Sequence, residues 1–336
     1  MGKFLVRRLL LGVLVLIGVI TITFLLTRVI PSDPAAKWAG ARATREQISA
    51  ARIELGLDKP ILVQYFKYIG DLLRGDLGRS LRSHQPITEE LKNYLPATLE
   101  LVVLSTVFAI IVGIPLGVLS AKRKDKLVDH FCRFFSVGAV SLPTFWVGMF
   151  LQLIFYTWLE WLPLGERVSF QLALMHRVPD ITGFVLLDSL FTGNFTVFWD
   201  AFRHIILPGI TVALYPIGLV ARMTRSSLLE ILGEDYISAA KSYAIPERKV
   251  LWNYALRNSL GPTSTVVTLS VGYTLVNTFL IEAIFSWPGI GMYISNAVTS
   301  LDYPSIMGVT IVSAIAYVAL NLVADIIVAL DPRVRV

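Results

Sequence analysis

Long uncharged runs of hydrophobic residues recur along the whole chain. A helix needs about 20 apolar residues to cross a hydrocarbon core about 30 Å thick. Six runs approach or exceed that length and predict membrane-spanning helices: Leu9–Thr27, Leu101–Ala121, Phe134–Leu159, Ile205–Ala221, Ser259–Ile281 and Ser305–Ala324. The fourth run is short and contains Pro208 and Pro216, which predict a kinked helix whose freed carbonyls bond to neighbours.

A seventh apolar stretch, Phe184–Trp199, is interrupted by Asp188 and by Gly193-Asn194. We interpret it as an interfacial or loop segment. Counting it as a span would place the most basic short segment of the chain outside, against the usual excess of Lys and Arg in cytoplasmic loops.

The positions of Lys and Arg predict the orientation of the spans. Lys3, Arg7 and Arg8 precede the first run, whose apolar part exceeds the roughly 7–15 residues of a signal peptide and so indicates a retained helix. With the N-terminus inside, the basic loop 122–126, the basic segment 222–257 and the C-terminal tail all lie inside. The loop 285–304, predicted outside, contains neither Lys nor Arg. Both termini are therefore predicted to be cytoplasmic.

Composition agrees with a multi-pass protein of the cell membrane. The chain has 336 residues, of which 55% are hydrophobic and 16% charged, whereas a soluble domain carries about 25% charged residues. The net charge of +6 is explained by the inner loops, so no nucleic-acid partner is inferred. A single cysteine, Cys132, excludes a disulfide framework, and four scattered histidines give no metal site.

The spans divide the chain into three parts. Residues 1–30 form the N-terminal cytoplasmic end and the first span, 31–96 an extracytoplasmic helical segment, and 97–336 a core with an outer loop at 160–203. Thr44-Arg-Glu-Gln47 has the form of a capping box, and Gly56 and Gly75 would each end a helix. The outer segment has two open readings: a structural cap or gate, and a docking surface for an external partner.

The inner segment 222–261 predicts a helix, a break and a second helix. An acidic start at Glu234 and Asp235 precedes a small apolar face at Ile237, Ala240 and Ala244, and Pro246 suits the first turn of the next helix. Such a short helix outside the bilayer is a plausible contact for a soluble partner. The alternative is a solvated connector.

Polar residues within three spans follow helical spacing. The stripes are Ser270, Tyr273, Thr274, Asn277 and Thr278 in the fifth; Ser141, Thr144, Gly148 and Gln152 in the third; and Thr310, Ser313, Tyr317 and Asn321 in the sixth. They either line a water-filled route or make hydrogen bonds between helices. In the second span, Ala109, Gly113, Gly117 and Ala121 recur every four residues and predict a close-packing seam.

Ionisable residues near the spans are Glu100, His204, Glu282 and Asp325, all at predicted ends, where side chains can snorkel or hydrate. None is assigned to a proton relay, which weakens the case for a proton-driven carrier. No Gly-x4-Gly-Lys-Ser/Thr phosphate loop, His-Glu-x-x-His or Gly-x-Ser-x-Gly motif occurs, so no catalytic residue is assigned. Gly233-Glu234-Asp235 lacks the second intramembrane aspartate of an intramembrane hydrolase, and no channel filter is evident.

Several blocks, in order along the chain, resemble the first permease subunit of dipeptide and oligopeptide importers of the ATP-binding-cassette superfamily. They are Glu54-Leu-Gly-Leu-Asp-Lys-Pro60, Gly75-Asp-Leu-Gly78 with Ser80, Pro96-Ala-Thr-Leu-Glu-Leu101, Thr182-Gly-Phe184, Arg222-Met-Thr-Arg-Ser-Ser227, Leu232-Gly-Glu-Asp-Tyr236, Ala255-Leu-Arg-Asn258, Phe285-Ser-Trp-Pro-Gly289 with Gly291, and Asp331-Pro-Arg333. The resemblance covers essentially the whole chain, and so many blocks in order make it specific.

The resemblance implies a second, similar permease subunit, two cytoplasmic ATP-binding subunits that use ATP and Mg, and an extracytoplasmic solute-binding protein. The chain itself would bind no cofactor. The family's coupling helix maps onto 234–245, with coupling residues Glu234, Asp235, Ser238, Ala239, Ala240 and Ala244. Ser238 replaces the usual Glu, Gly261-Pro262 the usual Leu-Pro, and Ala244 the usual Gly. If the turn needs a left-handed residue at 244, alanine there costs about 1 kcal/mol.

We therefore predict an all-α, six-span permease with both termini inside and the type I importer fold, working by alternating access. Its route would include Ser270, Tyr273, Asn277, Tyr317 and Asn321. Peptide is the expected cargo, with oligosaccharide or another small solute as an alternative. A gradient-driven secondary carrier and a binding-only membrane scaffold remain as other classes.

Overall fold

The computed structural model describes residues 2–29, 33–40, 42–175 and 180–330. Helices make up most of these ranges. The β-type backbone pairing within them is limited to one isolated bridge between Arg79 and Pro86. The first helices are α1 (Gly2–Val29), α2 (Pro34–Ala39), α3 (Arg45–Glu54), α4 (Ile61–Leu73), α5 (Ile87–Phe108), the π-helix η1 (Ala109–Gly113), α6 (Ile114–Lys122), α7 (Leu127–Ser141), α8 (Thr144–Gln152) and η2 (Leu153–Trp158).

The second half is equally helical. Its elements are α9 (Phe170–Met175), α10 (Val185–Phe191), α11 (Phe195–Leu232), α12 (Asp235–Ser242), α13 (Glu247–Lys249), the π-helix η3 (Val250–Leu256), α14 (Arg257–Asn277), α15 (Phe279–Ile284), α16 (Ile290–Ser300) and α17 (Tyr303–Leu330). The predicted block Asp331-Pro-Arg333 lies outside the described residues.

Four described helical stretches are long and apolar enough to cross a membrane: Val6–Thr27, Ile87–Lys122, Phe195–Leu232 and Tyr303–Val323. They match the predicted first, second, fourth and sixth spans. The predicted fifth span corresponds to α14 and α15, which meet at Thr278. Its many Ser and Thr residues make α14 more polar than these four, so it does not stand out by hydropathy.

The predicted third span, Phe134–Leu159, is not one continuous helix. α7 ends at Ser141 and α8 begins at Thr144, and the two axes differ by 104°. Proline lacks the N–H that would continue the helix and forces the preceding residue into extended backbone. Leu142, directly before Pro143, accordingly has φ −77° and ψ 139°. Counted as one broken span, the pair would be a fifth crossing.

α11 is the central helix of the bundle. It holds Pro208 and Pro216 within 38 residues of continuous helix, and it starts ten residues before the predicted fourth span. The stretch predicted as a loop or interfacial segment, 184–199, becomes the short α10 and the first turn of α11. About 72% of the most apolar window of α11 is buried, against 6% for α1.

The small residues of the second span pack directly against α11, as predicted. A Cβ on Gly117 would lie 2.6 Å from the carbonyl oxygen of Ala221, and one on Gly113 would lie 2.9 Å from Val220. Ala109 and Ala121 are buried on the same side. The seam therefore brings two backbones into close contact, which only small residues allow.

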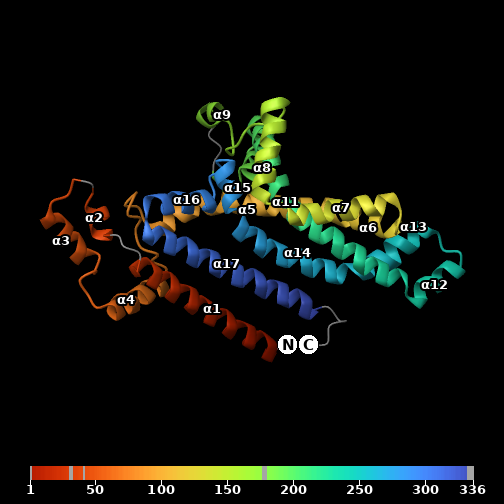
Figure 1. The fold of residues 1–336 in the computed structure, drawn as a ribbon, viewed down its shortest axis with the longest axis horizontal. Coiled ribbons are helices and arrows are strands. Elements are labelled where there is room, and N and C mark those ends of the chain that lie inside the picture. Colours follow the sequence, from red (N-terminus) through yellow and green to blue (C-terminus); the bar gives the residue numbers. More distant parts are fainter. Residues whose placement is uncertain (1, 30–32, 41, 176–179, 331–336) are drawn as a thin grey trace.

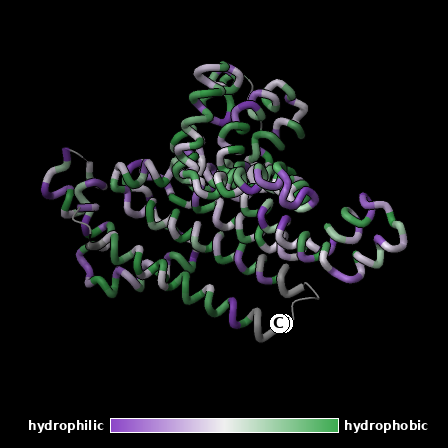
Figure 2. The backbone as a smooth tube through the Cα atoms, turned by 45° about the vertical axis from the view of Figure 1, so that its right-hand side comes forward, coloured by the Kyte–Doolittle hydropathy of each residue, from purple (hydrophilic) through white to green (hydrophobic). Residues whose placement is uncertain are grey.

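The long helices α1, α5, α14 and α17 run along the long axis of the molecule, with α2, α3 and α4 at one end and α12 and α13 at the other (Figure 1). Hydrophilic residues are frequent around α2 and α3 at one end and around α12 and α13 at the other, whereas hydrophobic residues follow the long helices and much of α4 (Figure 2). At the first end, the capping box of Thr44 and Gln47 is present as predicted, and Gly56 and Gly75 have φ of 65° and 80° just past α3 and α4. α5 crosses the predicted boundary at residue 96 without a break.

Candidate coupling segment and translocation pathway

α12 forms a separate short helix between two well-defined turns. Glu234 is its N-cap residue, with extended backbone, and Asp235 lies in the first turn, where a negative charge is favourable. Beyond Tyr243 the chain reverses: the N–H of Ala244 donates to the carbonyl of Lys241 (3.0 Å) and that of Ile245 to the carbonyl of Ala240 (3.2 Å).

Ala244 occupies the left-handed conformation, with φ 53°. The turn is therefore built in the form that favours glycine, and alanine accepts a strain of about 1 kcal/mol there. Pro246 follows in extended backbone and opens α13.

The two faces of α12 have different neighbours. Ile237 and Ala240 are buried in one apolar cluster with Leu228 of α11, Val118 of α6 and Val250 of η3. The remaining predicted coupling residues are exposed: Glu234, Asp235, Ser238, Ala239 and Ala244. Ala240 therefore belongs to the inner face that fixes α12 to the rest of the chain, whereas Asp235 and Ala239 belong to the outer face.

A buried ion pair ties together three helices, α6, α7 and α11, of which α6 and α11 also pack against α12. The guanidinium of Arg225 on α11 donates from Nε and Nη2 to the two carboxylate oxygens of Asp129 on α7, each at 2.8 Å. The hydroxyl of Ser120 on α6 donates to the same carboxylate. Bidentate charge-assisted bonds of this kind fix orientation as well as distance. The sequence analysis did not single out Asp129.

The predicted pathway residues do not form one lining. Ser270 is buried and donates to the carbonyl of Val267, whereas Tyr273 is exposed and stacks on Tyr215 of α11, with ring centroids 4.4 Å apart. The Asn277 amide donates to the carbonyl of Tyr273. The fifth-span stripe is thus divided between a buried face and an exposed face.

The sixth-span stripe lines a cavity of about 500 Å³ between α1, α14, α16 and α17. Thr310, Ser313 and Tyr317 face it from α17, and Thr278 faces it from the other side. Tyr317 also packs against Gly272 of α14. The Asn321 amide donates to the carbonyl of Tyr317 instead. In the third stripe, the Gln152 amide donates to the carbonyls of Leu164 and Ile284, so hydrogen bonding between segments explains that residue.

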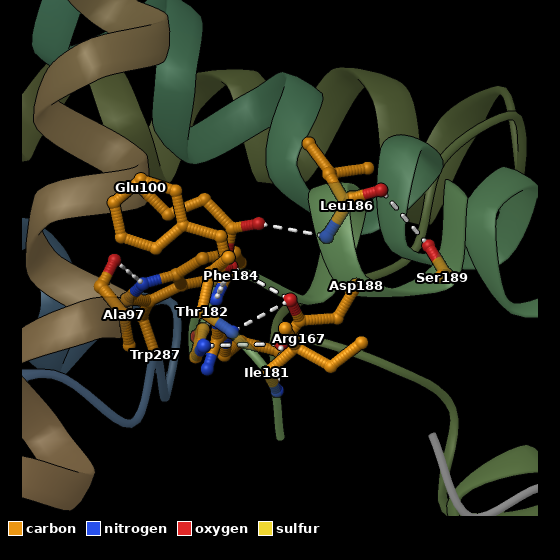
Figure 3. A network of polar contacts seen from close by, with 11 residues as sticks. Ala97, Glu100, Arg167, Ile181, Thr182, Phe184, Leu186, Asp188, Ser189 and Trp287 are labelled. Carbon is orange, nitrogen blue, oxygen red and sulfur yellow. Dashed lines mark hydrogen bonds and ion pairs between the residues drawn. The ribbon is translucent and has the colours of Figure 1, made fainter. Parts of the chain in front are cut away.

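Figure 3 shows a buried polar network around Glu100 of α5. It joins segments that are far apart in the sequence. The Arg167 guanidinium donates to the Glu100 carboxylate and to the carbonyl of Gly183, and it lies 5.9 Å from the centre of the Trp287 ring. The Trp287 indole N–H donates to the carbonyl of Ala97 (2.9 Å). The family-like blocks at 96–101, 182–184 and 285–289 therefore meet at one place.

Next to this network, Glu282 is completely buried. The Thr98 hydroxyl donates to its Oε1 (2.7 Å), and the N–H of Gly291 donates to its Oε2 (2.6 Å). Thr98 in turn accepts the N–H of Ile290 (2.8 Å). The carboxyl group thus fixes the start of α16 to α5.

Of the span-end groups that could snorkel or hydrate, Glu100 and Glu282 are instead buried, at 6% and 0% exposed, and His204 is buried as well. The loop after η2, which carries Gly165 and Arg167, and the turn after α15, which carries Trp287, fold back over these helix ends. Asp325 instead pairs with Arg8 of α1 at 3.1 Å. Across the described ranges, no group of three or more His, Cys, Asp or Glu side chains is placed to hold a metal ion.

These apolar helices define a multi-pass, all-α membrane protein. The profile of the family described as binding-protein-dependent transport system inner membrane component matches residues 113–336, and the profile of its N-terminal part matches residues 1–102. The chain belongs to this family of inner-membrane transport components.

Individual relatives match over nearly their full length. The chain is 42% identical to the probable D,D-dipeptide transport system permease protein of Escherichia coli, covering 96% of this chain and 94% of that protein. It is 41% identical to the dipeptide transport system permease protein of Alkalihalophilus pseudofirmus, covering 98% of each. Identity to the oligopeptide transport system permease protein of Bacillus subtilis is 33%, with both chains fully covered.

Proposed function

We propose that this chain is one of two homologous permease subunits of an ATP-driven importer for dipeptides and oligopeptides. It crosses the bilayer six times with both termini inside, in the type I importer fold, and carries the segment 31–96 outside. The support comes from the relatives, whose names specify dipeptide or oligopeptide transport. The same machinery importing oligosaccharides is the alternative.

One structural observation carries the coupling role. α12 presents an exposed outer face at the end of the molecule opposite α2 and α3 (Figure 1), and its inner face joins α6, α11 and η3 in one apolar cluster. A soluble subunit that gripped the outer face would therefore move α11, the most buried long helix, and η3, which continues into α14. Packed apolar cores transmit such displacements with little compression.

The energy for transport would come from two ATP-binding partner subunits that bind ATP and Mg. Closure of these subunits around α12 would be converted into rearrangement of α11, α14 and α17, and so into alternating access. A solute-binding protein would deliver cargo at the α2–α4 end. The route is assigned to the surface near Tyr273 and Asn277 and to the cavity facing Tyr317.

A matched set of variants tests the coupling surface. Asp235→Lys combined with Ala239→Trp changes only exposed side chains, so the isolated chain should lose no more than the helix-dipole contribution of Asp235, about 0.3–1 kcal/mol. Loss of a central interface contact costs about 2 kcal/mol or more, which weakens ATPase attachment by roughly 30-fold. Glu46→Lys, an exposed charge reversal on α3 at the other end of the molecule, is the control and should leave ATPase attachment unchanged. Unchanged attachment and uptake in the double variant would refute the coupling role.

Cargo and partners are tested by affinity purification of the complex from its native membrane. We expect a second permease, ATP-binding subunits and a binding protein loaded with peptide. A bound oligosaccharide would shift the cargo to that class. Uptake by this chain alone, reconstituted without ATPase and driven by an ion gradient, would indicate a secondary carrier instead.

A further inference from the structure

α4 has three distinct faces. Tyr65 and Tyr68 point toward α1, Leu72 shares their side of the helix by spacing, and Lys67 and Asp71 lie on another, polar side. Between them a third stripe consists of Leu62, Phe66, Ile69 and Leu73, which are spaced i, i+4, i+7 and i+11 and therefore share one side of the helix. A helix with water on all its free sides would not keep a continuous apolar stripe of this kind.

Three of the four large apolar side chains in this third stripe are strongly exposed. Leu62 is 70% exposed, Phe66 is 68% and Leu73 is 84%. None of the three is needed to hold α4 in place, because the Tyr65 hydroxyl hydrogen-bonds Thr21 of α1 (2.6 Å) and the rings of Tyr65 and Tyr68 pack on Phe24.

The contact with α1 fixes the depth of α4. Thr21 and Phe24 belong to the apolar stretch Val6–Thr27, which has the highest hydropathy in the chain. Thr21 lies six residues from the end of that stretch, and at 1.5 Å per residue this is about 9 Å along the helix axis. An amphipathic helix lying in a membrane interface sits at about this depth, 5–10 Å into the boundary between headgroups and acyl chains.

We propose that α4 lies in the bilayer interface at the Thr27 end of α1 and buries Leu62, Phe66 and Leu73 among lipid acyl chains. Lipid is favoured as the occupant because the neighbouring surface of α1 is itself apolar and exposed, through Ile22, Leu25 and Leu26. The α4 stripe continues that lipid-facing surface. On the polar side of α4, Lys67 is exposed and can reach the lipid headgroups or water, as long basic side chains do at interfaces.

Spin labels on the full-length chain test this placement. The variants are Leu62→Cys, Phe66→Cys and Leu73→Cys, with Lys67→Cys as the control from the polar side of the same helix. The only native cysteine, Cys132, is buried, so the unsubstituted chain gives the labelling background. Each protein is purified with its partners and reconstituted in phosphatidylcholine–phosphatidylglycerol vesicles. Collisions with oxygen report hydrocarbon, and collisions with a water-soluble nickel chelate report solvent.

Lipid insertion predicts a ratio of oxygen to nickel collisions severalfold higher at 62, 66 and 73 than at 67. Equal nickel access at all four positions would overturn the proposal, because α4 would then lie in water. Strong immobilisation at 62, 66 and 73, with shielding from both reagents, would also overturn it, because a protein subunit would then cover the stripe.

Discussion

Two fully buried carboxylic acids stabilise opposite ends of the bundle in different ways. Asp129 on α7 and Glu282 on α15 are each 0% exposed. Asp129 is held by the bidentate ion pair with Arg225 of α11, the helix that also packs against α12. Glu282 lies near α16 and accepts hydrogen bonds from neutral groups, the Thr98 hydroxyl and the Gly291 N–H. Within the described part of the chain, no cation is paired with Glu282.

The difference teaches how each junction responds to change. A buried charge that loses its partner is left uncompensated in a poor solvent, so the Asp129 junction depends strongly on both members. The stability of a carboxyl group held by neutral donors depends on the shape of its site and on the number of its hydrogen bonds. Such a site tolerates replacement by an isosteric amide better than an ion pair does. Substitutions that remove a charge should therefore lower stability most at the Asp129 junction. Substitutions that add side-chain volume should lower it most at the Glu282 junction.

Removing the cation from the first junction should have the largest effect. Arg225→Ala leaves the Asp129 carboxylate buried without its ion pair, which costs about 3–5 kcal/mol. Thermal unfolding of the chain in detergent would show a markedly lower melting temperature. Arg133→Ala is the control, because Arg133 approaches Asp129 only at 3.7 Å from an exposed position, and surface pairs contribute about 0–1 kcal/mol.

The double variant Arg225→Ala, Asp129→Ala separates charge from packing. Deleting both partners removes the unpaired carboxylate, so part of the lost stability should return. A double variant less stable than Arg225→Ala alone would show that the carboxylate is satisfied without the arginine.

Added volume should break the second junction. A Cβ at Gly289 would overlap the Glu282 carboxyl group and lie 2.5 Å from the Thr98 hydroxyl. Overpacking of this kind costs about 1–3 kcal/mol, so Gly289→Ala should lower the melting temperature. Gly138→Ala is the matched control: its Cβ meets open space in the last turn of α7, and alanine there should stabilise by at most about 0.5–1 kcal/mol. Equal behaviour of both variants would contradict the packing argument.

Local patterns in the sequence predicted those features that depend on near neighbours. The capping box at Thr44, the small-residue seam at Gly117 and the helix opened by Asp235 all follow from spacing within one or two turns. The break at Pro143 was equally local but was missed, because the apolar run on either side of the proline is uninterrupted by charge. A proline alone does not predict a helix break, because α11 stays continuous through both Pro208 and Pro216.

Features that depend on distant segments were not predictable in this way. Their positions at span ends left Glu100 and Glu282 free to hydrate, but the loop carrying Arg167 and the turn carrying Trp287 cover this region. Asp129 gave no local signal of its partner 96 residues away. The spacing of Ile237 and Ala240 predicted the inner face of α12, but Ala244 lies beyond the helix and is exposed, and Ala240 was assigned to the partner contact although it is buried.

A matched pair of amide substitutions sharpens the contrast between the two junctions. Asp129→Asn removes a charged acceptor from Arg225, and bonds to charged groups contribute about 1.5–3 kcal/mol. Glu282→Gln keeps an oxygen for Gly291 and an amide for Thr98, so its cost should stay near about 1 kcal/mol. The measurement is the difference in melting temperature between the two variants. A larger loss for Glu282→Gln would mean that Glu282 carries a charge that its neutral neighbours support.

Asp188 offers an intermediate case, buried without a cation but rich in donors. Burial alone raises the pKa of Asp188, yet hydrogen bonds from the Thr182 hydroxyl and from the N–H groups of Thr182, Gly183 and Ile181 outweigh it, so this pKa is held below its usual range. Because the folded-state pKa lies below the unfolded value of about 3.9, the contribution to stability is complete above that pH. It is lost as the pH falls through the folded-state value.

Asp188→Asn should therefore have a small effect with a distinctive pH dependence. At neutral pH the amide keeps one acceptor oxygen and loses the other, which costs about 1 kcal/mol. The difference in melting temperature between wild type and variant should stay constant above about pH 4 and shrink as the pH falls below the unfolded value of about 3.9, because the wild-type carboxylate then becomes protonated while the amide does not change. Asp58→Asn, at an exposed position, should match wild type throughout. A gap between Asp188→Asn and wild type that is independent of pH would show that the Asp188 loop is held by shape, as at the Glu282 junction, rather than by an ionised carboxylate.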